Sequence, residues 1–233
     1  MHGGKGRDKE ITRPMDGDFR PGGPGMTAPE ASGSVTNIPR PHSLAILSCG
    51  VGADQVLGAV LSSVRNGSST AIAAFPDVRR GFSRLLCDRL SVECGLSISE
   101  LTGAQAHTTQ APCIVPAQYT ARWSEATPAG PVRIEAVEIK EPAEAGSRLR
   151  SACTSAVTVF GSGIWLVVLA GMASNDIVEA ARFVKNAGGR VSVQDESTSL
   201  IWDAPRSVLQ AGLADEMLPL WGVSGLLGMV AEG

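Results

Sequence analysis

The stretch from Ile164 to Leu220 constrains the fold of this 233-residue chain more than any other segment. It opens with an apolar run, Ile164–Ala170, whose length and β-branched content are typical of a strand buried on both faces. A turn-rich segment, an amphipathic helix and the glycine pair Gly188-Gly189 follow. A second short strand, Arg190–Gln194, comes directly after the glycines. This strand–helix–strand order predicts a parallel sheet.

The rest of the chain continues the alternation of strands and helices. Buried strands are expected at 44–47, 70–75, 96–101 and 113–116, a half-exposed strand near 132–139, and helices near 56–64, 82–90, 147–159, 204–210 and 223–230. The pattern predicts a doubly wound α/β fold, a mostly parallel sheet with helices on both faces. Ligands of such sheets bind at the carboxyl ends of strands, so the loop with Met172 and Asn175 is a candidate site.

The first 42 residues differ in composition from the rest of the chain. They are rich in Gly, Pro, Ser, Thr and charged residues, and they contain too few apolar residues to form a core. We therefore expect a disordered tail over 1–42 and a single domain over 43–233.

Charge and cysteine usage narrow the class of protein. The net charge of −3 and the lack of a long basic run argue against nucleic acid as a partner. The apolar runs are too short to insert into a membrane, and the amino terminus does not resemble a secretory signal. The five scattered cysteines are expected to be free thiols in the reducing cytoplasm. No Cys/His cluster indicates a metal, and the sequence indicates no cofactor.

Five segments of the carboxyl half carry a resemblance to a known family. They are Ala170–Asp176 (AGMASND), Ala187–Gly189 (AGG), Gln194–Ser199 (QDESTS), Asp203–Val208 (DAPRSV) and Gly212–Leu220 (GLADEMLPL). In order and spacing they resemble the CheB-type chemotaxis methylesterase domain, which has TGMG-x-DG, AGG, QDE-x-TS, GMP-xx-A and G-x-ADE-x-LPL. The resemblance implies that the chain has the fold of the CheB catalytic domain and that it is a protein-glutamate methylesterase or deamidase. It also implies chemoreceptor cytoplasmic segments, or other signalling proteins, as partners.

The resemblance also assigns residues to the family's Ser-His-Asp triad. Ser48, in a strand–turn–helix segment, falls on the nucleophile. Asp77 stands in the place of the base His, and Asn175 in the place of the Asp. Met172 keeps its place in the loop on the oxyanion side. The segment from Val115 to Thr120 resembles a family segment that ends in His, with Thr120 in the His place.

Two of the three triad positions are therefore changed. Unperturbed aspartates have a pKa of about 3.9, which makes them poor general bases at neutral pH. We expect a methylesterase scaffold with little or no esterase activity. The family's full-length form has an amino-terminal receiver domain, and only the tail stands in that place, so control by phosphorylation within the chain is not expected. The alternatives are a non-catalytic chemotaxis signalling protein and, less favoured, an unrelated anion-binding α/β module that uses the Ser48–Gly52 turn.

Each candidate residue also has a purely structural interpretation. Ser48, Asp77 and Asn175 are each followed by a predicted helix, so each could cap one, and Asp77 could instead pair with Arg79. Met172 could belong to the core, and His107 is expected at the surface. His2 and His42 are expected to have no catalytic role.

Overall fold

A computed structural model describes residues 41–50, 52–65, 69–108, 111–125, 127, 130–140 and 147–230 of the chain. The predicted tail, residues 1–42, lies outside these ranges except for Pro41 and His42. Among the helices that the structure describes, none has the length and apolar character needed to cross a membrane.

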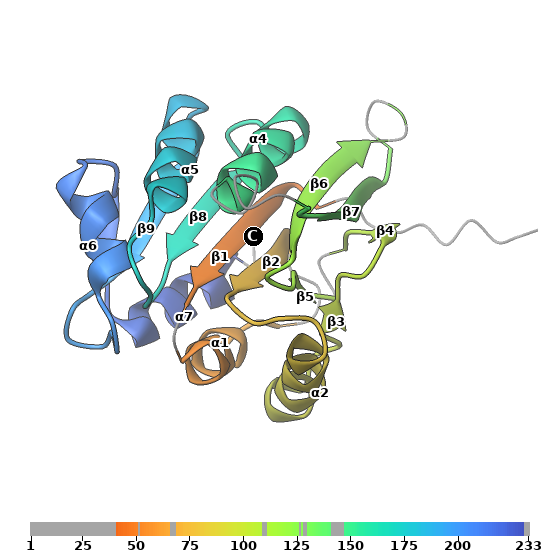
Figure 1. Cartoon of the computed structure of the whole chain (residues 1–233), viewed down its shortest axis with the longest axis horizontal. Coiled ribbons are helices and arrows are strands. Elements are labelled where there is room, and N and C mark those ends of the chain that lie inside the picture. Colours follow the sequence, from red (N-terminus) through yellow and green to blue (C-terminus); the bar gives the residue numbers. More distant parts are fainter. Residues whose placement is uncertain are drawn as a thin grey trace, which may run out of the picture. The chain divides into compact units, whose positions relative to one another are not determined.

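A parallel sheet of seven strands forms the centre of the described part (Figure 1). In spatial order it contains β10 (Glu216–Leu218), β9 (Arg190–Gln194), β8 (Ile164–Val168), β1 (Ser43–Cys49), β2 (Thr70–Pro76), β5 (Cys113–Ile114) and β3 (Ser99–Glu100). All of its strand pairs are parallel, as predicted. The chain runs from β1 to β2 on one side and later returns to β8 on the other. The carboxyl end of β1 is therefore the point where ligand sites of such folds form.

Helices cover both faces of the sheet, which confirms the doubly wound prediction (Figure 1). One face carries α1 (Ala53–Leu61), α2 (Phe82–Cys94) and α7 (Leu220–Val230), and the other carries α4 (Arg148–Phe160), α5 (Asn175–Asn186) and α6 (Asp203–Gln210). Strand side chains alternate between the two layers. In β1, Leu44 and Ile46 pack beneath α4, whereas Ala45 and Leu47 pack beneath α1. Each fully buried Leu or Ile contributes about 1.5–3 kcal/mol to folding.

A small antiparallel sheet lies beside the main one. It contains β4 (Ala104–Ala106), β7 (Val132–Glu138) and β6 (Tyr119–Glu125). Strand β7 confirms the predicted half-exposed strand, whereas the sequence patterns did not predict β6. Trp123 of β6 is buried against α4, where its backbone N–H donates to the Ser155 hydroxyl at 3.2 Å.

His107, expected at the surface, is buried under this small sheet with only 2% of its area exposed. The indole Nε1 of Trp123 donates to its Nδ1 at 2.8 Å, and its Nε2 lies 3.4 Å from the carbonyl oxygen of Ile72. Burial lowers the pKa of His107 to about 4, so the ring is neutral at neutral pH. The five cysteines are free, and all but the partly buried Cys94 are buried, as predicted.

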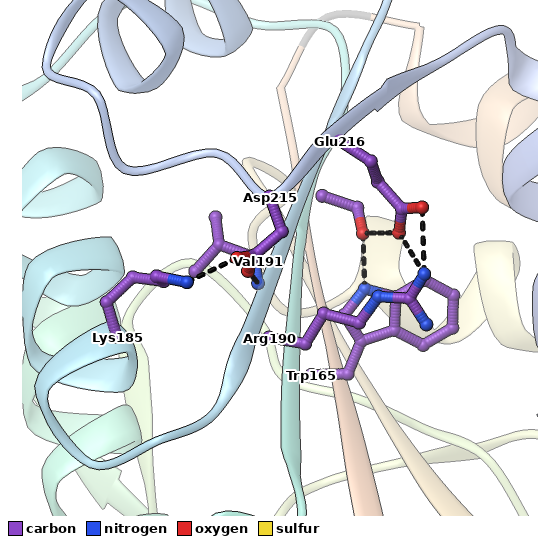
Figure 2. Close-up of polar contacts among 7 residues, drawn as sticks. Trp165, Lys185, Arg190, Val191, Asp215 and Glu216 are labelled. Carbon is purple, nitrogen blue, oxygen red and sulfur yellow. Dashed lines mark hydrogen bonds and ion pairs between the residues drawn. The ribbon is translucent and has the colours of Figure 1, made fainter.

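A cluster of polar side chains ties β8, β9 and β10 together at the edge of the main sheet (Figure 2). In this Glu216 cluster, the indole of Trp165 donates to the Ser192 hydroxyl at 2.6 Å, and that hydroxyl donates to Glu216 at 2.5 Å. Arg190 pairs with Glu216 at 2.7 Å and stacks over the ring of Trp165. Next to the cluster, Asp215 accepts hydrogen bonds from Lys185 and from the backbone N–H of Val191. The ADE segment of the resemblance is thus structural.

Candidate functional site

A pocket of about 350 Å³ opens at the carboxyl ends of β1 and β2, against the loop that follows β8. Its lining includes Ser48, Asp77 and Met172, three of the four candidate residues. They meet there because each ends, or closely follows, one of three neighbouring parallel strands. Arg148 and Asp176 also line the pocket.

Ser48 lies in β1 on the same face as Leu44 and Ile46, opposite Phe75 of β2 and Val168 of β8. Its hydroxyl forms no hydrogen bond with any residue that the structure describes. Helix α1 begins only at Ala53, and Gly52 is its N-cap residue. The interpretation of Ser48 as a helix cap is therefore wrong, and its hydroxyl remains available to a ligand.

The loop beside Ser48 is held by Gln194, which belongs to a segment of the family resemblance, and by Ile201. The side-chain oxygen of Gln194 accepts from the backbone N–H of Ala170 at 2.9 Å. The backbone N–H of Gly171 donates to the carbonyl of Ile201 at 2.9 Å. Gly50 packs so closely on Gly171 that a β-carbon at position 50 would lie 2.9 Å from the Gly171 Cα. Glycine at position 50 therefore allows the β1 turn and the β8 loop to approach each other across the pocket.

Gln194 and its neighbours also account for the QDESTS segment. The Asp195 carboxylate accepts hydrogen bonds from the Thr198 and Ser197 hydroxyls and from the Thr198 backbone N–H. These bonds, led by that from the Thr198 hydroxyl, lower the pKa of Asp195. Asp195 therefore satisfies polar groups of its own turn.

Asp77 follows β2 and lies on the rim of the pocket. Its backbone N–H donates to the carbonyl of Cys49 at 3.2 Å, which fixes its position beside β1. Helix α2 begins at Phe82 with Gly81 as its N-cap residue, so Asp77 does not cap it. Within the described ranges, its exposed carboxylate forms no hydrogen bond or ion pair, and the suggested pairing with Arg79 is absent.

The loop after β8 places Met172 and Asn175 differently. Met172 is 62% exposed and lines the pocket, so it is not a core residue. Asn175 is exposed and is not among the residues that line the pocket. Helix α5 begins at Asn175, and the hydroxyl of Ser174 caps it by accepting from Ile177 N–H at 3.3 Å. The interpretation of Asn175 as the cap is therefore wrong.

Arg148 is the pocket residue that sequence reasoning missed. Its Nε donates to the carbonyl of Tyr119 at 2.8 Å, and one Nη donates to the carbonyls of Val115 and Pro116 at 2.6 and 3.2 Å. The guanidinium stacks on the ring of Phe75, 5.1 Å from its centroid. Burial lowers the pKa of Arg148 to about 10, and nearby carboxylates oppose that effect, so it is a cation at neutral pH.

The sequence did contain a signal for Arg148, because a cation stands there at an unfavourable position. Arg148 is the first residue of α4, and the partial positive charge at that end of a helix destabilises a cation. The stabilising negative charge comes instead from Asp176 of α5, which accepts from the backbone N–H groups of Leu149 and Arg150 at 2.7 and 2.9 Å. Both oxygens of Asp176 are therefore engaged in holding the start of α4.

Other residues with nucleophilic or basic side chains do not act at this pocket as they stand. Burial raises the pKa of the Cys49 thiol to about 12, so it is not a thiolate at neutral pH. His42 precedes β1, roughly 20 Å from Ser48 along the strand. His107 is hydrogen-bonded elsewhere and does not line the pocket. The part of the chain that the structure describes thus brings no imidazole to Ser48. His2 lies outside it.

A second pocket, of about 430 Å³, adjoins the first and shares Gly50 and Asp77 with it. Phe82 and Leu85 of α2 line it, and they are 71% and 65% exposed. Apolar surface of this kind beside a polar pocket suits a polypeptide ligand better than a small ion.

Comparisons with known proteins agree with this geometry. The sequence model of the CheB methylesterase family matches residues 45–227. Two curated relatives from Myxococcus xanthus are a protein-glutamate methylesterase/protein-glutamine glutaminase, 27% identical over 86% of this chain, and the protein-glutamate methylesterase FrzG, 29% identical over 81%. The aligned regions cover 57% and 55% of those relatives, so the chain spans little more than half their length.

The fold has a close counterpart among solved structures. The CheB methylesterase catalytic domain of Thermotoga maritima superposes with a TM-score of 0.71 at 19% identity, covering 81% of this chain and 98% of that domain. The alternative of an unrelated α/β anion-binding module is therefore wrong. From the family match over most of its length and from this shared fold, we conclude that the chain belongs to the CheB methylesterase family.

Proposed function

We propose that this chain binds glutamyl-bearing segments of chemoreceptors, or of related signalling proteins, and has little or no activity on their methyl esters. It is a pseudoenzyme of the methylesterase family. Relatives named as methylesterases and glutaminases support the substrate class. The exposed Phe82 and Leu85 beside the pocket support a polypeptide ligand.

One observation carries the loss of activity. The hydroxyl of Ser48 has no base within the described ranges, because the two described histidines lie elsewhere and Asp77 stands where the family has its His. A serine hydroxyl needs a base to accept its proton and a third group to orient that base. Asn175 cannot supply the third function because its side-chain amide is neutral. Loss of general base catalysis reduces rates by about 10²–10⁴-fold.

The proposed domain extends from 43 to 233, with a tail over 1–42. The first strand of the main sheet begins at Ser43, and the family match begins at residue 45, which supports this boundary. Binding to cytoplasmic receptor segments would make the protein cytoplasmic.

Methanol release from a methyl-esterified chemoreceptor cytoplasmic fragment tests the proposal. We expect the full chain to release methanol no faster than its Ser48→Ala variant. Release that clearly exceeds the background and is abolished by Ser48→Ala would overturn the proposal. A His2→Gln variant would then show whether the tail supplies the missing imidazole. Retention of the same fragment on the immobilised chain tests the binding half of the proposal, and failure to retain it would contradict that half.

A further inference from the structure

The pocket holds hydrogen-bond donors that the protein itself leaves unused. Arg148 uses Nε and one Nη to contact carbonyl groups, and its other Nη, Nη1, donates to no described residue. That nitrogen is therefore not fully buried, and Arg148 lines the pocket. The Ser48 hydroxyl is unpaired in the same way.

The backbone of two other lining residues adds further unpaired donors. Within the described ranges, the N–H groups of Met172 and Ala173 have no acceptor, and both residues line the pocket. A guanidinium, a hydroxyl and two amides around one cavity form an environment for a group that carries only acceptors. A cavity of about 350 Å³ has room for a side-chain end and several waters.

The charged residues around Arg148 determine whether the pocket favours an anionic or a neutral ligand. Asp176 also lines the pocket, but its oxygens accept from the backbone at the start of α4. Asp77 lies on the rim with no ion pair among the described residues. Arg148 is therefore the pocket's one described cation. Of the two carboxylates that line the pocket, Asp77 acts on Arg148 more strongly than Asp176 does, and only Asp77 has no hydrogen-bond partner among the described residues.

We infer that this pocket binds the free carboxylate of a glutamyl side chain and discriminates against its methyl ester and its amide. The inference rests on the proposed function and names the form of the side chain that is bound. The carboxylate accepts from Nη1 of Arg148 and from the Ser48 hydroxyl, the donors to which a charged acceptor binds most strongly. The methyl ester has no negative charge, and its methyl group blocks one of the two oxygens that would accept these hydrogen bonds. The domain would then detect demethylated glutamate instead of producing it.

Titration of the ¹⁵N-labelled full chain by NMR tests this inference with three matched probes. They are N-acetyl-glutamate α-methylamide, its γ-methyl ester and the corresponding glutamine derivative. We expect the free acid to shift the signals of Gly50, Gly171 and Met172, and to bind at least about 10-fold more tightly than the other two. Equal or tighter binding of the ester or the amide would overturn the inference, as would the absence of saturable binding by the acid.

Asp77→Asn is the decisive variant, because it leaves the contacts of Arg148 with the fold in place. Removal of the competing carboxylate should tighten binding of the acid about 3- to 10-fold and leave the ester unaffected. Asp88→Asn is the matched control, since it removes the same charge from an exposed site on α2 outside the pocket. Unchanged or weaker binding of the acid by Asp77→Asn would contradict the inference.

The same titration separates failure of this inference from failure of the proposed function. Free methanol gives a sharp proton signal. If that signal grows during the ester titration with the wild-type chain but not with Ser48→Ala, the proposed lack of hydrolysis is wrong. If no methanol forms and the ester binds as well as the acid, the proposed function stands and only the carboxylate preference fails.

Discussion

The Glu216 cluster and the Ser48 pocket are two polar regions of the same sheet. The side chains of the cluster are hydrogen-bonded to one another, whereas some of those that line the pocket are unpaired within the described part of the chain. In the cluster, the indole of Trp165, the hydroxyl of Ser192 and the carboxylate of Glu216 satisfy one another (Figure 2). In the pocket, the side chains of Ser48 and Asp77 have no partner among the described residues. Polar groups that lack a partner within the protein are expected at sites where a bound ligand provides that partner.

The comparison shows that family resemblance alone does not separate structural from functional residues. The ADE segment matches the family pattern and holds strands together. Asp77 and Asn175, the residues that we propose for two triad positions, depart from that pattern. The pocket loop is held by the side chain of Gln194, which belongs to a segment that matches the family pattern. Under the proposed function, the site therefore keeps its shape although the catalytic groups differ.

The largest expected effect comes from restoring the triad. The double variant Asp77→His/Asn175→Asp should hydrolyse a methyl-esterified receptor fragment at least about 10²-fold faster than the wild type, since a positioned base contributes that much. Methanol release measures the gain, and the additional substitution Ser48→Ala should abolish it. A folded double variant with no gain would contradict the assignment of Asp77 and Asn175 to the triad positions.

His107 should behave as a structural residue like those of the Glu216 cluster. Its pKa is about 4 in the folded chain and 6.5 in the unfolded chain, so the unfolded chain takes up the proton first as pH falls. Its contribution to stability is full above pH 6.5 and is lost as pH falls towards 4, a loss of about 3 kcal/mol. Denaturant unfolding across this range should show a smaller decline for His107→Gln. An equal decline would contradict the buried neutral ring.

Breaking the Glu216 cluster should destabilise the fold by a smaller amount. Glu216→Ala leaves Ser192 and Arg190 without their acceptor, and we expect a loss of about 2 kcal/mol in the free energy of unfolding. Glu216→Gln keeps an acceptor and should lose less. An unchanged urea midpoint for Glu216→Ala would show that the cluster is not structural.

The smallest effect is expected at the pocket rim. Asp77→Ala should change the free energy of unfolding by no more than about 0.5 kcal/mol, because its carboxylate has no partner within the described ranges. Urea unfolding of Asp77→Ala and Glu216→Ala under the same conditions compares the two losses of stability directly. A loss as large as that of Glu216→Ala would mean that Asp77 is structural and that the two regions do not differ as described.

Much of the fold could be predicted because it depends on local patterns. Buried parallel strands read as apolar runs, such as Ile164–Ala170, and their carboxyl ends place Ser48, Asp77 and Met172 at one edge. The position of Arg148 could not be predicted in this way. It depends on the carbonyls of Val115, Pro116 and Tyr119, about 30 residues earlier in the chain.

His107 and β6 were missed for a related reason. The sequence around His107 is polar, which suggests a surface loop, but the pairing of β4 with β7 brings the ring under Trp123 of β6. Such long-range antiparallel pairing leaves a weak trace in local hydrophobicity.

The most direct test of the central claim is the reactivity of Ser48 itself. Fluorophosphonates label serines that a neighbouring base activates, so their rate of reaction reports the state of the Ser48 hydroxyl without any assumption about the natural substrate. Mass spectrometry after incubation of the full chain with such a probe should find Ser48 unmodified, with no difference from Ser48→Ala. Rapid, stoichiometric labelling of Ser48 would show that a base acts on it and would contradict the account.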